Sequence, residues 1–363
     1  MRTCVRFALF VMGFAVLLVV GFAARPADAG KPTAPPPPMP IDYVLTWLPA
    51  PDGVSDTEAT SINGSGIVAG QYGPFSDNRL KRACVWTFAG VFALHNLAAV
   101  PDGWVLLTAR GINDAGQIAG SAMRLADGLT RIYRFDPATD TTPAQVTFMG
   151  DPNSNAAQSI VQNRPINNLG DVAYGISGAN QTVVTHVQTV GGQVFQTQQS
   201  FYFNSISDAR QLVGASRRWT LATGQVETFS TSITGMDINV SGHFAGRVIS
   251  KGSNYRALRY QSSAQAIGPQ SSWAYGINSS GDLVGSVTNT GVGFVFTDVY
   301  GYVDLDTLVV GGAGDMAQWH AAFAIRPMKI TNHATGEFGE IAGLAFFDGD
   351  VSKAFVLTPI PAT

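Results

Sequence analysis

A nine-residue pattern repeats along the chain and constrains the fold more than any other feature of the sequence. It reads Ile-Asn, two residues, Gly, one residue, an aliphatic residue, Ala or Val, and Gly, and residues 62–70 and 112–120 are its clearest copies. Five further copies, several with departures from the pattern, begin at Ile166, Ile206, Ile238, Ile277 and Ile330. A sustained period of about 45 residues is typical of repeat proteins such as propellers and solenoids.

Each copy is predicted to form the turn of a β-hairpin. Ile ends one short strand, and the Asn side chain that follows can hydrogen-bond to the backbone two residues further on. The Gly three residues after Asn supplies the positive φ that a type I turn with a bulge requires. The residues assigned to these turns are Asn63, Gly66, Asn113, Gly116, Asn167, Gly170, Asn239, Gly242, Asn278 and Gly281. Arg210 stands where the fourth copy should have this Gly, so we expect a strained or altered turn there.

Two further strands are expected after each hairpin, with few helical patterns between them. Third strands are predicted at residues 82–87, 131–135, 256–260 and 353–357, and fourth strands are predicted at 91–97 and 302–305. Four short strands in a unit of about 45 residues indicate a β-propeller blade.

The two ends of the repeat region predict how the ring closes. Residues 43–48 form a strand before any copy of the pattern, whereas the chain ends with a third strand and no fourth. The N-terminal strand can therefore complete the last blade and remove its exposed edge. The sequence predicts an all-β protein, a β-propeller of seven four-stranded blades over residues 41–363. Six blades, eight blades and an open solenoid are the alternatives.

The N-terminus has the features of an export signal. Arg2 and Arg6 precede an unbroken apolar run at residues 7–24, and the small residues of Ala27-Asp28-Ala29 suit a signal-peptidase site. We predict that residues 1–29 are a signal peptide, with a retained N-terminal anchor as the alternative. The mature protein is then secreted, extracellular or periplasmic.

The segment after the predicted signal peptide is a proline-rich spacer, residues 30–40. Such a composition favours an extended polyproline helix. Beyond it the mature chain keeps one cysteine, Cys84, in an apolar alternating run. A single thiol cannot form an internal disulfide, so Cys84 is expected to pack as a small core residue.

Charge and motif content exclude several classes of function. Charged residues make up 13% of the chain and the net charge is −3, whereas an electrostatic nucleic-acid binder needs a basic excess. No G-x-S-x-G elbow or phosphate-binding glycine loop is present. No two histidines have the spacing of metal ligands; they are His95, His186, His243, His320 and His333. We predict no catalytic residue, no metal and no cofactor.

The repeat unit resembles the HAF family of probable extracellular repeats, which are exported bacterial proteins. The resemblance is clearest at residues 59–70, followed by Arg82-Ala83-Cys84-Val85-Trp86, and it extends over about 41–358. The family has His at the first position of the third strand, where this chain has Arg82, Arg256 and Lys353. The resemblance implies a secreted or cell-surface propeller with no established chemistry.

Two arginines are candidate ligand-binding residues in the axial channel. Arg110 and Arg164 both lie two residues before the Ile of their repeat, in strands expected to line the channel. Together with Lys329 they could bind an anion. The alternative is that they pair with acids such as Asp237.

Two tryptophans are candidate contacts for a sugar or a peptide. Trp104 and Trp319 lie near Asp and Gly residues in segments expected on the loop-bearing face. A flat ring can stack on the apolar face of a sugar. The alternative is that these rings wedge between blades.

The function predicted from these features is binding without catalysis. An exported monomeric propeller would recognise a polysaccharide, a peptide or a surface protein with its loops and channel mouth. No nucleic acid and no membrane span after signal cleavage are expected. A secreted hydrolase or lyase acting on polysaccharide is the alternative, because propellers host many activities.

Overall fold

The computed structural model describes residues 41–51, 56–74, 77, 79–151, 154, 156–177, 183–200, 202–230, 232–249, 254–332, 338–349 and 351–361. All of them belong to Pro37–Thr363, the larger of the two units into which the chain divides. The predicted signal peptide (1–29) and spacer (30–40) lie outside the described residues. Within the described ranges, no helix combines the length and the apolar character needed to cross a membrane.

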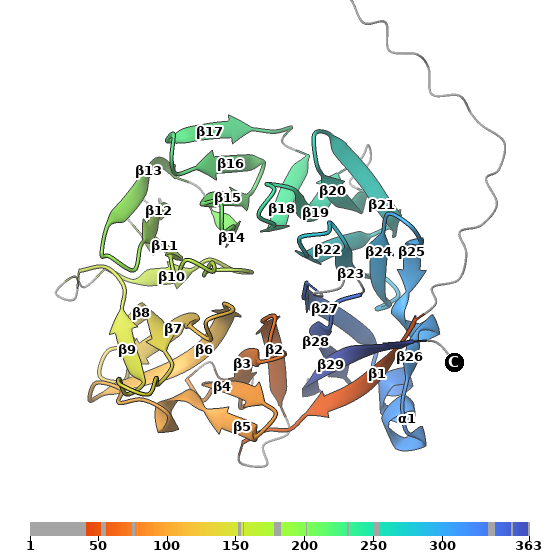
Figure 1. Cartoon of the computed structure of the whole chain (residues 1–363), viewed down its shortest axis with the longest axis horizontal. Helices are drawn as coiled ribbons and strands as arrows, with labels where there is room; N and C mark the ends of the chain where they lie inside the picture. Colours follow the sequence, from red (N-terminus) through yellow and green to blue (C-terminus); the bar gives the residue numbers. More distant parts are fainter. Residues whose placement is uncertain are drawn as a thin grey trace, which may run out of the picture. The chain divides into compact units, whose positions relative to one another are not determined.

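Seven sheets are arranged in a ring, so this unit is an all-β, seven-bladed propeller, as predicted (Figure 1). Six blades have four antiparallel strands each, paired in chain order from the centre of the ring outward. Blade by blade, these strands are β2 (Thr57–Ile62), β3 (Val68–Tyr72), β4 (Arg82–Thr87) and β5 (Gly90–Ala93); β6 (Trp104–Ile112), β7 (Ile118–Arg124), β8 (Thr130–Asp136) and β9 (Gln145–Phe148); β10 (Gln158–Ile160), β11 (Val172–Ser177), β12 (Val183–Gln188) and β13 (Val194–Ser200); β14 (Phe203–Ile206), β15 (Gln211–Gly214), β16 (Arg217–Thr220) and β17 (Gln225–Thr228); β18 (Ile233–Ile238), β19 (Phe244–Ile249), β20 (Tyr255–Tyr260) and β21 (Ala264–Gln270); β22 (Ser272–Ile277), β23 (Leu283–Val287), β24 (Gly293–Thr297) and β25 (Gly301–Asp304).

The seventh blade joins the two ends of the propeller. It contains β27 (Ala324–Ile330), β28 (Ile341–Phe347), β29 (Val351–Pro361) and β1 (Ile41–Leu48). β1 runs antiparallel to β29 over its whole length, from Ile41 opposite Pro361 to Leu48 opposite Ala354. The predicted closure by the N-terminal strand is therefore present.

Two elements near the seventh blade were not predicted. The two-residue strand β26 (Val309–Val310) pairs in parallel with β1 and becomes a fifth strand of the sheet. Helix α1 (Ala313–Ala321) follows it and buries Trp319 against the seventh blade. Both lie in the long connection between β25 and β27, which carries no copy of the repeat.

The repeat turns adopt the left-handed conformation that their sequence requires. The turn glycines have φ between +73° and +90° in the copies that keep them; they are Gly66, Gly116, Gly170, Gly242 and Gly281. Arg210, which replaces this glycine, has φ of +55°. An L-residue in this region costs about 1 kcal/mol or more, so the fourth turn keeps its geometry at the expense of strain. Cys84 is buried, as predicted.

The closing Gly of the repeat lies against the innermost strand of its own blade. A Cβ at Gly70 would collide with the Glu58 carbonyl oxygen, and one at Gly120 with that of Thr108. The same collision, with the carbonyl four residues before the repeat's Ile, would arise at Gly214, Gly246, Gly285 and Gly343. In these six blades the innermost strand has a one-residue bulge two positions before that Ile. Glycine thus lets the bulged strand close onto its neighbour.

The third blade departs from this arrangement because its repeat ends in Tyr174 instead of Gly. Tyr174 lies opposite Ile160, and the Ala173 N–H donates to the Pro165 carbonyl oxygen at 2.8 Å. Residues 161–164 therefore leave the sheet, so the bulge contains four residues where the other blades have one. A tyrosine side chain cannot fit where a glycine meets the inner strand, which explains the longer bulge.

Candidate functional site

In the five repeats that have it, the Asn ties neighbouring blades together as well as closing its own turn. Asn63 Oδ1 accepts the N–H groups of Ser65 and Ile67, while Nδ2 donates to the Asn113 carbonyl oxygen of the next blade at 3.1 Å. The equivalent bond links Asn113 to Asn167, Asn167 to Ser207, Asn239 to Asn278, and Asn278 to Thr331. These amides surround the channel at the end that carries the repeat turns, which we call the turn face.

This arrangement makes a prediction for Asn113, whose side chain is buried. Asn113→Asp keeps the oxygen that accepts the Gln117 N–H at 2.9 Å but loses the donor to the Asn167 carbonyl. An unsatisfied buried carbonyl beside a new carboxylate should lower the free energy of unfolding by about 1–3 kcal/mol at neutral pH. Denaturant unfolding measures it, and Asn96→Asp, the same change at an exposed asparagine, is the control. An unchanged midpoint for Asn113→Asp would contradict an inter-blade role.

The third residue of each repeat, which follows Asn in five copies and Ser207 in the fourth, lies at the rim of the channel. Asp114, Asn168 and Asp208 occupy this position in three consecutive blades. Asp114 Oδ1 accepts the Gly64 N–H at 2.9 Å, and Asp208 Oδ1 accepts the Asn168 N–H at 2.8 Å. Asn168 Nδ2 donates to both carboxylates, at 2.8 Å to Asp114 and 3.1 Å to Asp208. The rim is thus a hydrogen-bonded arc with two acidic groups.

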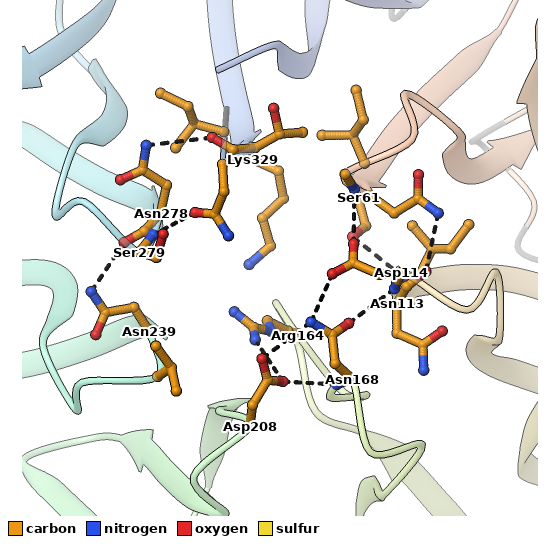
Figure 2. A pocket seen from close by; sticks show the side chains of 18 of the residues that line it. Ser61, Asn113, Asp114, Arg164, Asn168, Asp208, Asn239, Asn278, Ser279 and Lys329 are labelled. Atoms are coloured by element: carbon orange, nitrogen blue, oxygen red, sulfur yellow. Dashed lines mark hydrogen bonds and ion pairs between the residues drawn. The ribbon is translucent and has the colours of Figure 1, made fainter. Parts of the chain in front are cut away.

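Inside the rim lies a cavity of about 220 Å³, lined by residues of several blades (Figure 2). Its walls are built largely from the Ile and Asn of the repeats, such as Ile112 and Asn278. Its cationic lining residues are Arg164 and Lys329, and both side chains point toward its centre in Figure 2. The cavity therefore has positive groups in its interior and negative groups at its rim.

Arg164 reaches this cavity because of the four-residue bulge in the third blade. The Arg164 backbone bridges Ser205 of the fourth blade in parallel, and its N–H donates to the Asn204 carbonyl oxygen at 3.0 Å. The guanidinium makes two long contacts, at 3.3 Å with the Ile238 carbonyl oxygen and at 3.4 Å with Asp208 Oδ1. A guanidinium has five N–H donors, so Arg164 has donors to spare for a ligand.

Lys329 and Asp237 form a buried ion pair at the base of the cavity. Lys329 Nζ lies 2.5 Å from Asp237 Oδ2, and the two side chains are 7% and 0% exposed. Asp237 also accepts the Ser205 hydroxyl at 2.7 Å and the Ile277 N–H at 3.2 Å. This is the pairing with Asp237 that the sequence offered as an alternative for its channel cations, made here by Lys329.

The pair changes the titration of both partners. Burial lowers the pKa of Lys329 to about 8, because the attraction of Asp237 offsets only part of the desolvation and Arg164 repels the ammonium. Burial alone would raise the pKa of Asp237, but Lys329, Arg164 and the hydrogen bonds from Lys329 and Ser205 outweigh it and hold that pKa below its usual value. The carboxylate is therefore the more firmly ionised partner.

Asn163, the other polar residue of the long bulge, crosses the channel. Its Nδ2 donates to the carbonyl oxygens of Met236, at 3.1 Å, and Tyr275, in the fifth and sixth blades. Its Oδ1 is buried without a hydrogen-bond partner. A buried amide that spans three blades obstructs the axis and holds the bulge in place.

The structure separates Arg110 from Arg164, although the two share a position in the repeat. The Arg110 guanidinium forms an ion pair with Glu58 at 3.5 Å and is not part of the cavity lining. Arg110 lies at a one-residue bulge in a regular strand, whereas Arg164 lies in the longer bulge. Of the two arginines, only Arg164 lines the same cavity as Lys329.

The two tryptophans do not line this cavity. Trp104 packs on Phe148 with ring centroids 4.7 Å apart. Trp319 is 1% exposed, contacts Phe355 edge-on, and donates its indole N–H to Asp306 at 2.8 Å. Both rings are thus engaged in packing, and Trp319 has no surface left for a ligand.

Sequence reasoning missed Asn163 and the acidic rim. The rim residues occupy the third position of the repeat, after Asn in five copies and after Ser207 and Thr331 in the other two, so the pattern itself carried that signal. The signal for Asn163 was Tyr174, the departure from the closing Gly.

Within the described ranges, no three His, Cys, Asp or Glu side chains are grouped as metal ligands, and no histidine lines the cavity.

Comparison with known proteins shows the fold alone. No family model matches the chain, and no curated protein matches it either. Among solved structures, a streptogramin B lyase is similar with a TM-score of 0.52 and 12% identity, over 88% of this chain and 98% of that one. Virginiamycin B lyase from Staphylococcus aureus has a TM-score of 0.50 and 14% identity, over 87% and 99% of the two chains. The same lyase in a catalytically inactive form with quinupristin has a TM-score of 0.51.

Proposed function

We propose that this protein is an exported, non-enzymatic binding module of the HAF type that holds a small carboxylic acid at its turn face. The observation that carries the proposal is the convergence of Arg164 and Lys329 on one cavity of about 220 Å³. Both side chains have unused N–H donors, and such donors form strong, charge-assisted hydrogen bonds to a carboxylate.

The rim limits which acids fit. Asp114 and Asp208 accept hydrogen bonds, so an occupant with hydroxyl or ammonium donors beside its carboxylate would satisfy both parts of the site. The volume lies below the range of about 300–1,000 Å³ usual for ligand sites. A single sugar acid or amino acid, free or at the end of a polysaccharide or peptide, meets both conditions.

Binding to the purified protein tests this proposal. In a calorimetric screen of galacturonate, glutamate and their uncharged analogues, we expect the acids alone to bind. Arg164→Gln should weaken binding at least about tenfold, since a charge-assisted hydrogen bond is lost. Arg110→Gln is the matched control, because that arginine shares the repeat position but lies outside the cavity. Equal losses in both variants would contradict the assignment.

Affinity should also depend on pH. Because the pKa of Lys329 is about 8, this amine loses its charge as the pH rises through that value. Binding of an acid should therefore weaken above pH about 8 while the protein stays folded. Lys329→Met should remove this dependence, and a flat profile in the parent protein would exclude Lys329 from the site.

Lyase activity is a second candidate, and Lys329 is the observation that favours it. A lysine with a pKa of about 8 can act as a base when neutral, as removal of a proton next to a carboxylate requires. Lyases are also among the proteins of similar fold. Turnover of polygalacturonate that rises with pH through about 8 and disappears in Lys329→Met would replace the binding proposal with this one.

A further inference from the structure

A row of stacked arginine and aromatic side chains crosses three blades at the end of the channel opposite the turn face. Trp273 is the second residue of β22, far from the repeat turn at the end of that strand. The Arg247 guanidinium of the fifth blade lies 3.8 Å from the centre of the Trp273 ring. Trp273 stacks on Tyr275 at 6.1 Å, and Arg326 of the seventh blade lies 5.8 Å from the Tyr275 ring. We call this row the ladder.

Further rings flank both ends of the ladder. Arg247 also lies 5.4 Å from the Tyr255 ring, and Arg326 lies 4.9 Å from the Phe346 ring. Each guanidinium therefore has an aromatic ring from its own blade and one from the neighbouring blade against it. Such stacking orders a flexible side chain before any ligand arrives.

The ladder arginines keep their hydrogen-bonding edges free. Among the described residues, neither the Arg247 nor the Arg326 guanidinium forms a hydrogen bond or an ion pair, and Arg247 Nε is buried without a partner. Arg124 shows the contrast: it also lies over a tryptophan ring, at 5.7 Å, but Asp127 takes its donors at 2.6 and 3.0 Å. Stacking uses the face of a guanidinium and leaves its edge for an anion.

A groove adjoins the ladder at Tyr255. The Tyr255 hydroxyl is hydrogen-bonded to Thr288 at 2.7 Å. Val287, Asn289 and Thr290, on either side of Thr288, line a groove of about 670 Å³ together with Gln270. This volume is within the usual range for ligand sites, and its amide and hydroxyl groups suit a polyhydroxylated chain. The groove also contains one carboxylate, Asp304, which accepts the Tyr302 hydroxyl at 2.7 Å, so the sugar carboxylates are expected at the ladder arginines and the sugar hydroxyls in the groove.

We propose that the ladder and this groove bind an acidic polysaccharide, a polymer of sugars that carry carboxylates. Aromatic rings such as Trp273 contact the C–H faces of the sugars, and the edges of Arg247 and Arg326 bind the carboxylates in pairs of hydrogen bonds. A single-stranded nucleic acid also offers rings and anions, but two cations on a chain of net charge −3 give little of the phosphate neutralisation on which such binding depends.

Calorimetric titration of the full chain with polygalacturonate tests the proposal, with dextran as the neutral polymer and oligodeoxythymidylate as the nucleic acid. We expect polygalacturonate to bind best. Arg247→Gln and Arg326→Gln should each weaken it at least about tenfold, and Arg326→Lys should weaken it as well, because lysine lacks the paired donors. Arg124→Gln, the stacked but ion-paired control, should leave the affinity unchanged.

The outcomes separate this site from the one at the turn face. Arg164→Gln should affect galacturonate binding in the cavity but not polymer binding at the ladder. Arg326 is exposed, so its substitution preserves the fold even if Arg247→Gln does not. Equal binding of dextran, tighter binding of the oligonucleotide, or full affinity in Arg326→Gln would overturn the proposal.

Discussion

Val44→Pro is expected to destabilise the whole propeller, with an unfolding free energy lower by about 3 kcal/mol or more. Val44 lies in the middle of β1, between Thr358 of β29 and Val310 of β26. The Tyr43 N–H donates toward β26, to the Leu308 carbonyl oxygen at 2.8 Å. Because N–H groups alternate along a strand, that of Val44 faces β29, and proline removes it from the closing ladder.

The loss of stability should exceed that of one hydrogen bond, because β1 closes the ring. Its residues Tyr43 and Leu45 are buried in the same cluster as Phe355 of β29. A detached β1 would expose this core and leave the β29 edge open. Thermal unfolding followed by circular dichroism, with limited proteolysis near Leu48, measures the effect.

Val44→Ala is the matched control for this variant. It keeps the N–H and removes only part of a half-buried side chain, so it should cost about 1 kcal/mol or less. If the proline variant unfolded at the same temperature as the alanine variant, β1 would not be needed to hold the ring closed.

Breaking the Lys329–Asp237 pair should have the second largest effect. Asp237→Asn leaves a buried ammonium without its counter-ion, and Lys329→Met leaves a buried carboxylate held only by its remaining hydrogen bonds. Each change is expected to lower the unfolding free energy by about 3–5 kcal/mol. The double variant should lose less than the two single losses together, since neither charge is left alone. Strict additivity would mean that the pair is not coupled.

The unfolding free energy should also depend on pH in the acid range, because Asp237 titrates there. Its pKa is below the ordinary 3.8 in the folded protein, so the unfolded chain binds a proton more readily. The stability that this shift provides is complete above the unfolded value and is lost as pH falls through the folded one. The parent protein should lose more stability on acidification than Asp237→Asn does. Equal losses of unfolding free energy in the two proteins would argue against a lowered pKa of Asp237.

The sequence by itself determined the strands, the turns and the closure. Local patterns encode these features: Asn and Gly set each turn, and a strand at the start matches a missing strand at the end. The closing glycines also carried a packing constraint, because a Cβ at Gly70 or Gly120 would strike the innermost strand. Helix α1 and strand β26 escaped prediction since their segment contains no repeat.

Only the tertiary structure decided what fills the channel. Arg110 and Arg164 occupy the same position in the repeat, yet one pairs with Glu58 and the other enters the cavity. The difference arises from Tyr174, which forces four residues out of the third blade and toward the axis. Lys329 likewise meets Asp237 from two blades away in the ring. A side chain's neighbours in a channel depend on how all seven blades pack around it, and no local pattern carries that information.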